Sequence, residues 1–148
     1  MRMALSLALR GTGKVSPNPR VGCVLVRENS VVGWGFHGYY GGPHAEAEAL
    51  RRAGERARGS TAYVTLEPCS HHGKTPPCAD ALLEAGVSRV VVGVRDPNPK
   101  VDGGGMRRLR EGGISCTEGV LEPLCRQINR GFFHVLSRGR PWVTAKGA

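Results

Sequence analysis

Four side chains in this 148-residue chain have the types and spacing of a catalytic zinc site. His44 and Glu46 form an H-x-E pair, and Cys69 and Cys78 enclose a loop of eight residues. One imidazole and two thiolates give three protein ligands, which leaves the fourth position of a tetrahedral zinc site for water. Glu46 is then placed to move protons as a general acid and base without binding the metal. We therefore expect one Zn²⁺ per chain.

A structural zinc site is the main alternative, because such sites usually have four protein ligands. His71 or His72 could be the fourth ligand, but the carboxylate of Glu46 would then have no purpose beside His44. We interpret Glu48 as a solvated helix residue. Glu67 is interpreted either as a group that supports the ligands or as a turn residue.

Polar side chains near the expected ligands indicate a substrate site for a polar, anionic molecule. The loop between the cysteines carries His71, Lys74 and Thr75, and Lys74 is the expected phosphate partner. Asn18 lies between two prolines, which makes its amide a rigid donor and acceptor. A similar proline-fixed turn follows a probable strand, where ligands bind in open α/β sheets. The expected substrate contacts are Asn18, His71, Lys74, Thr75, Asp96 and Asn98.

The order of expected elements is that of an α/β protein. Apolar and β-branched runs with turn signals predict strands at Val21–Arg27, Val31–His37, Thr61–Leu66, Arg89–Val94 and Ile114–Thr117. Apolar periodicity, Pro and Gly predict helices at Met1–Leu9, His44–Arg52 with Pro43 at its first position, Cys78–Ala85, Met106–Glu111 and Leu121–Leu136, with a distortion at Gly131. Residues 141–146 are expected to be extended, and Gly33 and Gly35 to allow a bulge or a close backbone approach.

This order predicts a mixed sheet covered on both faces by helices. The first two strands should form an antiparallel hairpin, and the later β-α-β units should be parallel. No repeat or linker divides the sequence, so we expect one domain over residues 1–148.

Composition excludes several classes of protein. No apolar run approaches the about 20 residues that span a bilayer, and Met1–Arg10 has no cleavage site, so we expect a cytoplasmic protein without a membrane partner. The five cysteines are an odd number, which disfavours a disulfide scaffold. Cys23, Cys116 and Cys125 are interpreted as small core residues. The net charge of +9 is interpreted as a solvated basic surface.

The motifs resemble the diaminohydroxyphosphoribosylaminopyrimidine deaminases of riboflavin biosynthesis. The resemblance covers nearly the whole chain and rests on SPNPRVGCVLV (16–26), GGPHAEAEAL (41–50), VTLEPCSHHGKTPPCADALLEAG (64–86) and VRDPNPKVDGGG (94–105). The eight-residue spacing of the cysteines differs from the two-residue spacing in tRNA adenosine and cytidine deaminases.

This resemblance implies a cytidine-deaminase-like fold, a three-layer α/β/α sandwich. It implies zinc on His44, Cys69 and Cys78, with Glu46 as the proton shuttle. The implied substrate is a small pyrimidine ribotide, 2,5-diamino-6-ribosylamino-4(3H)-pyrimidinone 5′-phosphate. Residues 139–148 resemble the lead-in to a reductase domain of the same family, and we expect no reductase activity from this chain.

Two other functions stay open from the sequence. A nucleic-acid or nucleoside base deaminase would need stacking aromatic residues, and Tyr39 and Tyr40 are the candidates among three Tyr, three Phe and two Trp. Nucleic acid is the less favoured partner, because no aromatic residue lies between the cysteines. A non-enzymatic zinc or nucleotide-binding module would have no need of Glu46. The sequence also leaves open whether the chain forms a homo-oligomer, and whether a reductase is fused or separate.

Overall fold

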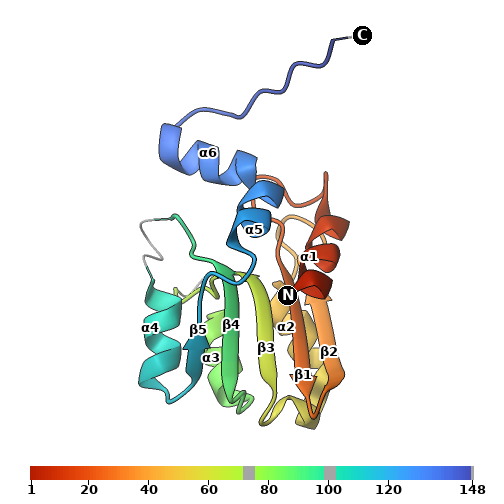
Figure 1. The fold of residues 1–148 in the computed structure, drawn as a ribbon, viewed down its shortest axis with the longest axis vertical. Helices are drawn as coiled ribbons and strands as arrows, with labels where there is room; N and C mark the ends of the chain where they lie inside the picture. The colour runs from red at the N-terminus through yellow and green to blue at the C-terminus, as the bar shows by residue number, and fades with distance from the viewer. Residues whose placement is uncertain (72–75, 99–102, 148) are drawn as a thin grey trace.

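A mixed five-stranded sheet in the order β2-β1-β3-β4-β5 forms the centre of the molecule (Figure 1). The structure is a computed structural model, and it describes residues 1–71, 76–98 and 103–147. The strands are β1 (Gly22–Arg27), β2 (Ser30–Phe36), β3 (Thr61–Leu66), β4 (Arg89–Val94) and β5 (Ser115–Thr117). The helices are α1 (Arg2–Ala8), α2 (Ala45–Ala53), α3 (Cys78–Glu84), α4 (Gly104–Glu111), α5 (Glu122–Ile128) and α6 (Arg130–Arg138), with 3-10 turns at Leu9–Gly11 and Gly54–Ala57.

The directions of the strands decide which loops meet. Strand β1 is antiparallel to both β2 and β3, and β3, β4 and β5 are parallel to one another. The predicted hairpin and parallel units are therefore confirmed. Because β2 and β3 both oppose β1, the carboxyl ends of β2, β3 and β4 lie at one edge of the sheet, beside the start of β1. The four segments that carry the expected site residues leave or enter the sheet at this edge.

Helices cover both faces of the sheet, which confirms the predicted three-layer α/β/α arrangement. On one face, buried side chains of α2, α3 and α4, such as Ala49, Leu82 and Leu109, pack against Leu25 and Val92 of the sheet. On the other face α1 and α5 form a second core with β3 and β4, and α1 also packs on β1. In Figure 1 these two helices lie in front of the sheet, and α6 lies beyond its upper edge.

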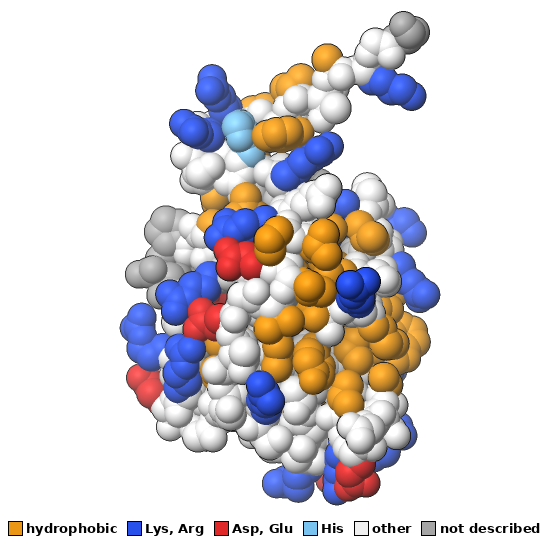
Figure 2. All heavy atoms as spheres, viewed as in Figure 1, with side chains coloured by type: hydrophobic (Ala, Val, Ile, Leu, Met, Phe, Trp, Pro, Cys, Tyr) orange, Lys and Arg blue, Asp and Glu red, His pale blue; other side chains and the backbone are white. Residues whose placement is uncertain are grey.

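The surface supports the interpretation of scattered basic charge. Figure 2 shows Lys and Arg side chains distributed around the molecule, with hydrophobic side chains gathered where Figure 1 places α1, β1 and β2. Several arginines in the second half of the chain pair with acids, including Arg108 with Asp80 at 2.7 Å and Arg126 with Glu122 at 2.7 Å. Among the helices that the structure describes, none has the length and apolar character needed to cross a membrane.

The structure corrects two expected helix boundaries. Helix α2 begins at Ala45, and His44 is its N-cap residue with an extended backbone (φ −70°, ψ 159°), so Pro43 precedes the helix. The expected helix Leu121–Leu136 is two helices, and the break is at Asn129 (φ −115°, ψ 20°) and not at Gly131. At this break the Asn129 side chain accepts a hydrogen bond from the Arg20 backbone N–H and donates one to the Arg20 carbonyl oxygen.

The structure also differs from the expectations for Cys116 and for residues 141–146. Cys23 and Cys125 are fully buried, as expected for small core residues, but Cys116 in β5 is only half-buried. Strand β5 has just three residues and pairs on one side with β4, which leaves its outer edge uncovered by any strand in the described chain. Residues 141–146 have the irregular conformation of an exposed segment.

Two glycines let α2 lie directly on β2. A Cβ atom at Gly35 would overlap the carbonyl oxygen of Ala45 and would lie only 2.7 Å from the backbone nitrogen of Ala49. A Cβ at Gly33 would overlap the carbonyl oxygen of Ala49 in the same way. The expected close approach is therefore confirmed, and a register shift at Leu25/Val26 also places an irregularity in this hairpin. The helix that carries His44 and Glu46 is held against the sheet at backbone distance.

We predict that Gly35→Ala lowers the free energy of unfolding by about 1–3 kcal/mol, because the new methyl group forces helix and strand backbones apart. Urea denaturation measures this change. Gly38→Ala is the matched control, because its Cβ would lie 3.8 Å from the Phe36 ring, an ordinary contact, and should change stability by less than about 0.5 kcal/mol. An unchanged urea midpoint for Gly35→Ala would show that α2 does not depend on this close contact.

Candidate metal centre

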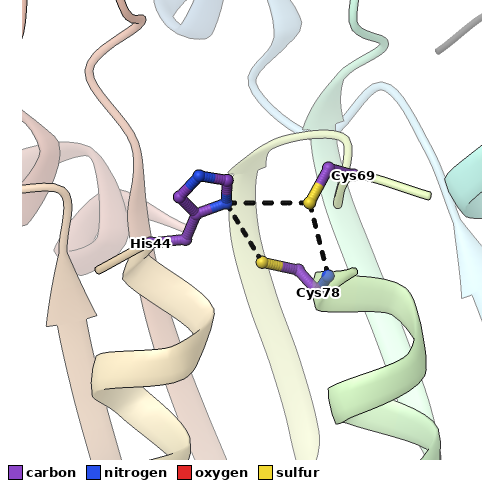
Figure 3. A group of neighbouring side chains, drawn as sticks. All are labelled: His44, Cys69 and Cys78. Carbon is purple, nitrogen blue, oxygen red and sulfur yellow. Dashed lines mark hydrogen bonds between the residues drawn. The ribbon is translucent and has the colours of Figure 1, made fainter. Parts of the chain in front are cut away.

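Three potential metal ligands converge at the edge of the sheet where the strands end. His44 is the N-cap of α2, Cys69 follows β3, and Cys78 is the first residue of α3. Their ligand atoms all lie within 4.8 Å of one another. Figure 3 shows the imidazole of His44 directed at both sulfur atoms, with the two cysteines on the opposite side of the cluster. His44, which is 25 residues from Cys69 and 34 from Cys78, therefore joins the two cysteines in one compact donor set.

The distances in this cluster fit a tetrahedral zinc ion. The Nδ1 atom of His44 is 3.2 Å from the Cys78 sulfur and 3.6 Å from the Cys69 sulfur. With zinc bonds of about 2.3 Å to sulfur and about 2.0 Å to nitrogen, tetrahedral geometry separates sulfur from nitrogen by about 3.6 Å. The three residues can hold the ion with little rearrangement, and among the described residues no fourth His, Cys, Asp or Glu joins the group. An open fourth position is the mark of a catalytic site.

The two cysteines interact at the start of α3, and their pKa values shift in opposite directions. The backbone N–H of Cys78 donates a hydrogen bond to the Cys69 sulfur at 3.3 Å. A hydrogen bond from the Cys78 thiol is the main reason that the pKa of Cys69 falls to about 4, and the same interaction raises the pKa of Cys78. The first thiolate therefore forms readily, whereas the second needs a cation beside it. This donor set favours a divalent metal ion.

Glu46 is a buried carboxyl group next to the donor set. Its side chain is only 3% exposed, and it lines a cavity together with His44 and Cys69. Burial raises the pKa of the Glu46 carboxyl to about 7, although the nearby His44 opposes this rise. A carboxyl group with such a pKa can both accept and donate a proton near neutral pH, which suits a general acid and base.

The cavity in front of the cluster has a volume of about 220 Å³. The structure places four of the expected substrate contacts in its wall: Asn18, His71, Asp96 and Asn98. Lys74 and Thr75 lie outside the described residues. His44 is exposed on its outer side, so the cavity opens to solvent beside the metal ligands. The arrangement can hold a small polar molecule with one atom near the fourth metal position.

Glu67 holds together the segments that form the cavity wall. Its carboxylate is 4% exposed and accepts hydrogen bonds from the backbone N–H groups of Asp96 (3.3 Å), Gly105 (3.1 Å) and Met106 (3.2 Å). It thereby joins the end of β3 to the loop after β4 and to the first turn of α4. The Asp96 carboxylate in turn accepts a hydrogen bond from the Asn98 N–H at 2.9 Å. The sequence left two interpretations of Glu67 open, a supporting group or a turn residue. These hydrogen bonds agree with the supporting group.

His37 is a site residue that the sequence gave no reason to select. It follows β2, is 3% exposed and packs edge-on against the His44 ring, with 5.7 Å between ring centroids. Its Nδ1 atom lies 3.0 Å from the carbonyl oxygen of Pro43, which can only accept, so Nδ1 carries the proton. In the neutral ring Nε2 is then an acceptor for the Asn18 Nδ2 at 3.2 Å. This pairing leaves the Asn18 carbonyl oxygen available to the cavity.

We predict that Asn18 and His37 are energetically coupled. The single variants Asn18→Ala and His37→Phe should together cost about 1 kcal/mol more in unfolding free energy than the double variant, because the double variant leaves neither partner unsatisfied. Chemical denaturation of all four proteins gives the coupling energy. The control pair combines Asn18→Ala with Ser88→Ala, a residue that bonds Gly59 and Ser60 elsewhere. Additivity of Asn18 and His37 within about 0.3 kcal/mol would contradict the pairing.

Comparison with known proteins finds a deaminase zinc-binding region in the part of the chain that contains His44, Cys69 and Cys78. Residues 1–94 match the family model for the cytidine and deoxycytidylate deaminase zinc-binding region. The riboflavin biosynthesis protein RibD of Escherichia coli K12 is 53% identical over 146 residues, which are 99% of this chain and 40% of that protein. The chain thus spans about two fifths of the length of this relative.

Solved structures confirm the predicted fold. The structure of a diaminohydroxyphosphoribosylaminopyrimidine deaminase/5-amino-6-(5-phosphoribosylamino)uracil reductase from Thermotoga maritima superimposes with a TM-score of 0.92 at 46% identity, over 96% of this chain and 41% of that one. RibD of Acinetobacter baumannii gives a TM-score of 0.91 at 51% identity, over 95% and 40% of the two chains. The predicted resemblance is confirmed, and zinc is the metal that the matched region binds.

Proposed function

The chain belongs to the cytidine and deoxycytidylate deaminase family, and from this premise we propose that it deaminates 2,5-diamino-6-ribosylamino-4(3H)-pyrimidinone 5′-phosphate. The products are 5-amino-6-ribosylamino-2,4(1H,3H)-pyrimidinedione 5′-phosphate and ammonia, in a step of riboflavin biosynthesis. The observation that carries this proposal is the cluster of His44, Cys69 and Cys78 beside the buried Glu46. The name of the Thermotoga maritima relative, a diaminohydroxyphosphoribosylaminopyrimidine deaminase and reductase, supports this choice of substrate.

His44, Cys69 and Cys78 are the proposed zinc ligands. Zinc bound to them supplies Lewis-acid activation of water, which makes a nucleophile available at neutral pH. The two sulfur atoms and the imidazole nitrogen hold the donor positions from three segments whose backbones are fixed by the sheet and by α2 and α3. Their rigid placement reduces the rearrangement that the protein must undergo when the substrate arrives.

Glu46 is the proposed proton carrier. Its carboxylate receives a proton from the attacking water and passes it to a ring nitrogen of the pyrimidine. The carboxylate then takes the remaining proton from the hydroxyl group on the ring carbon and passes it to the amino group, which leaves as ammonia as the carbon–nitrogen bond breaks and the oxygen becomes a carbonyl. Burial of Glu46 supports this role, because a carboxyl group that is shielded from solvent and has a raised pKa exchanges its proton with the substrate.

Asn18, His71, Thr75, Asp96 and Asn98 are proposed to contact the substrate, and Lys74 of the cysteine loop is the proposed partner of its phosphate. The Asn18 carbonyl oxygen is an acceptor that His37 holds in one orientation, so it suits a ring N–H or an amino group. The Thermotoga relative is named for a deaminase and a reductase. We therefore propose that a reductase, fused or separate, uses the product, and that residues 1–148 form the deaminase domain.

We predict about one zinc ion per chain in the purified protein and less than about 0.1 in Cys69→Ser or Cys78→Ser, because a thiolate ligand supplies both charge and geometry. Metal analysis after dialysis measures this, and circular dichroism checks that each variant is folded. The control is Cys116→Ser, whose half-buried thiol donates only to the carbonyl oxygen of Ile114. Full zinc retention by the Cys69 and Cys78 variants would rule out these ligands.

We predict that Glu46→Gln lowers turnover of the ribotide by about 10²–10⁴-fold and leaves zinc content unchanged, since the amide cannot carry the proton. Ammonia release and metal analysis on the same sample test both parts. Glu48→Gln is the control on the same helix, because Glu48 pairs with Arg51 and Arg52 at the surface, and it should retain activity within about twofold.

Cytidine and a tRNA anticodon stem serve as competing substrates in that assay. Ammonia from either of them, with none from the ribotide, would keep the metal chemistry and overturn the proposed substrate. Ammonia from none of the three by the zinc-loaded wild-type chain would contradict the enzyme assignment for this chain alone.

A further inference from the structure

We propose that Asn129, at the junction of α5 and α6, is a positioning residue that holds Asn18 at the wall of the metal cavity. Asn129 is not among the described residues that line this cavity, and it acts through the backbone of Arg20. The proposal rests on the proposed function for its kinetic consequence. It gives a role in the site to a helix junction near the C-terminal end of the chain.

The segment that follows Asn18 lies between two cavities. Asn18, Pro19 and Val21 line the metal cavity, whereas Arg20 lines a second cavity of about 520 Å³. Asn18 lines both cavities, so the two spaces meet at its side chain. Asn129 also lines the second cavity, where the junction of α5 and α6 lies beside the segment after α1 (Figure 1). It can therefore hold the Arg20 backbone without occupying the space for the pyrimidine.

Two hydrogen bonds fix the backbone of Arg20. The Asn129 amide accepts one from the Arg20 N–H and donates one to the Arg20 carbonyl oxygen, each at 2.8 Å. Asn129 is 3% exposed, so water has little access to either bond. Because Pro19 has no N–H group, the Arg20 N–H is the first backbone donor after Asn18. Paired bonds to one residue set its orientation as well as its position, as in the pairing of strands.

The sheet begins to hold this segment one residue later. The Val21 carbonyl oxygen accepts a hydrogen bond from the backbone N–H of His37 at 3.0 Å, and the Gly22 N–H donates to the Thr65 hydroxyl at 3.1 Å. The helix junction therefore holds the chain between Asn18 and the sheet. Small displacements of a group that orients the substrate can lower the rate strongly, so this contact bears on the reaction.

A kinetic double-variant cycle on the zinc-loaded full chain tests the positioning role. We expect Asn129→Ala to lower kcat/KM for the ribotide by at least about fivefold, because Asn18 loses its orientation towards the ring. In the Asn18→Ala background the same change should lower kcat/KM by less than about twofold, since the residue through which it acts is gone. The matched control is Ser88→Ala, which removes buried bonds to Gly59 and Ser60 and should change kcat/KM by less than about twofold in both backgrounds. Equal losses with and without Asn18, or no loss with Asn18 present, would overturn the inference.

Asn129→Asp provides the same test if Asn129→Ala does not fold. The carboxylate has the shape of the amide and still accepts from the Arg20 N–H, but it has no donor for the Arg20 carbonyl oxygen. It should lower kcat/KM by at least about threefold, and again only when Asn18 is present. Circular dichroism and metal analysis check the fold and the zinc content of each variant. A loss that persists in the Asn18→Ala background would show that Asn129 acts on the whole domain and not through Asn18.

Hydrogen exchange separates this inference from the proposed function, because it requires no turnover. Solvent-exchange NMR on the isotope-labelled chain follows the Asn18 Nδ2 hydrogens, which are bonded to the His37 ring. Asn129→Ala or Asn129→Asp should speed their exchange by at least about threefold, and Ser88→Ala should leave it unchanged. If the wild-type chain releases no ammonia from the ribotide but exchange at Asn18 responds to Asn129, the proposed function fails and the positioning stands. Unchanged exchange at Asn18 in the Asn129 variants would refute the positioning, whatever the wild-type activity.

Discussion

The close approach of two cysteine sulfurs and one imidazole is the constraint on which the site depends. Their ligand atoms lie within 4.8 Å of one another, and only one of the two thiols ionises readily without a neighbouring cation. A divalent metal ion relieves this conflict, because it neutralises both thiolates while the neutral imidazole completes the set. The rest of the fold brings the three segments to these positions, and among the described residues no fourth His, Cys, Asp or Glu joins them.

The order and directions of the strands bring these segments together. Because β1 opposes both of its neighbours, the segments after β2, β3 and β4 leave the sheet at the edge where β1 begins. Those segments carry His44, Cys69 and Asp96, and the approach to β1 carries Asn18. Glu67 and His37 then tie neighbouring segments together through buried hydrogen bonds. These hydrogen bonds connect site residues that lie in loops or at helix starts.

The sequence predicted the parts of this structure that have local causes. The bounds of β3 and β4 were correct, because runs of apolar and β-branched residues end there just before proline-containing segments. The proposed metal ligands were recognisable because His44 and Cys78 each follow a proline at the start of a helix and Cys69 follows Pro68 in the loop before α3. The pairs that were missed are His37 with Asn18 and Asn129 with Arg20, which lie 19 and 109 residues apart. Each depends on tertiary contact, and no periodicity or spacing in the chain indicates it.

The basic residues behind the net charge of +9 lie in two kinds of surroundings. Several surface arginines are neutralised by neighbouring acids, as in the pairs of Arg108 with Asp80 and Arg126 with Glu122. Arg20 and Arg130 instead face a cavity that meets the metal site. The positive charge is therefore divided between groups that acids neutralise and groups that form no ion pair in the described chain.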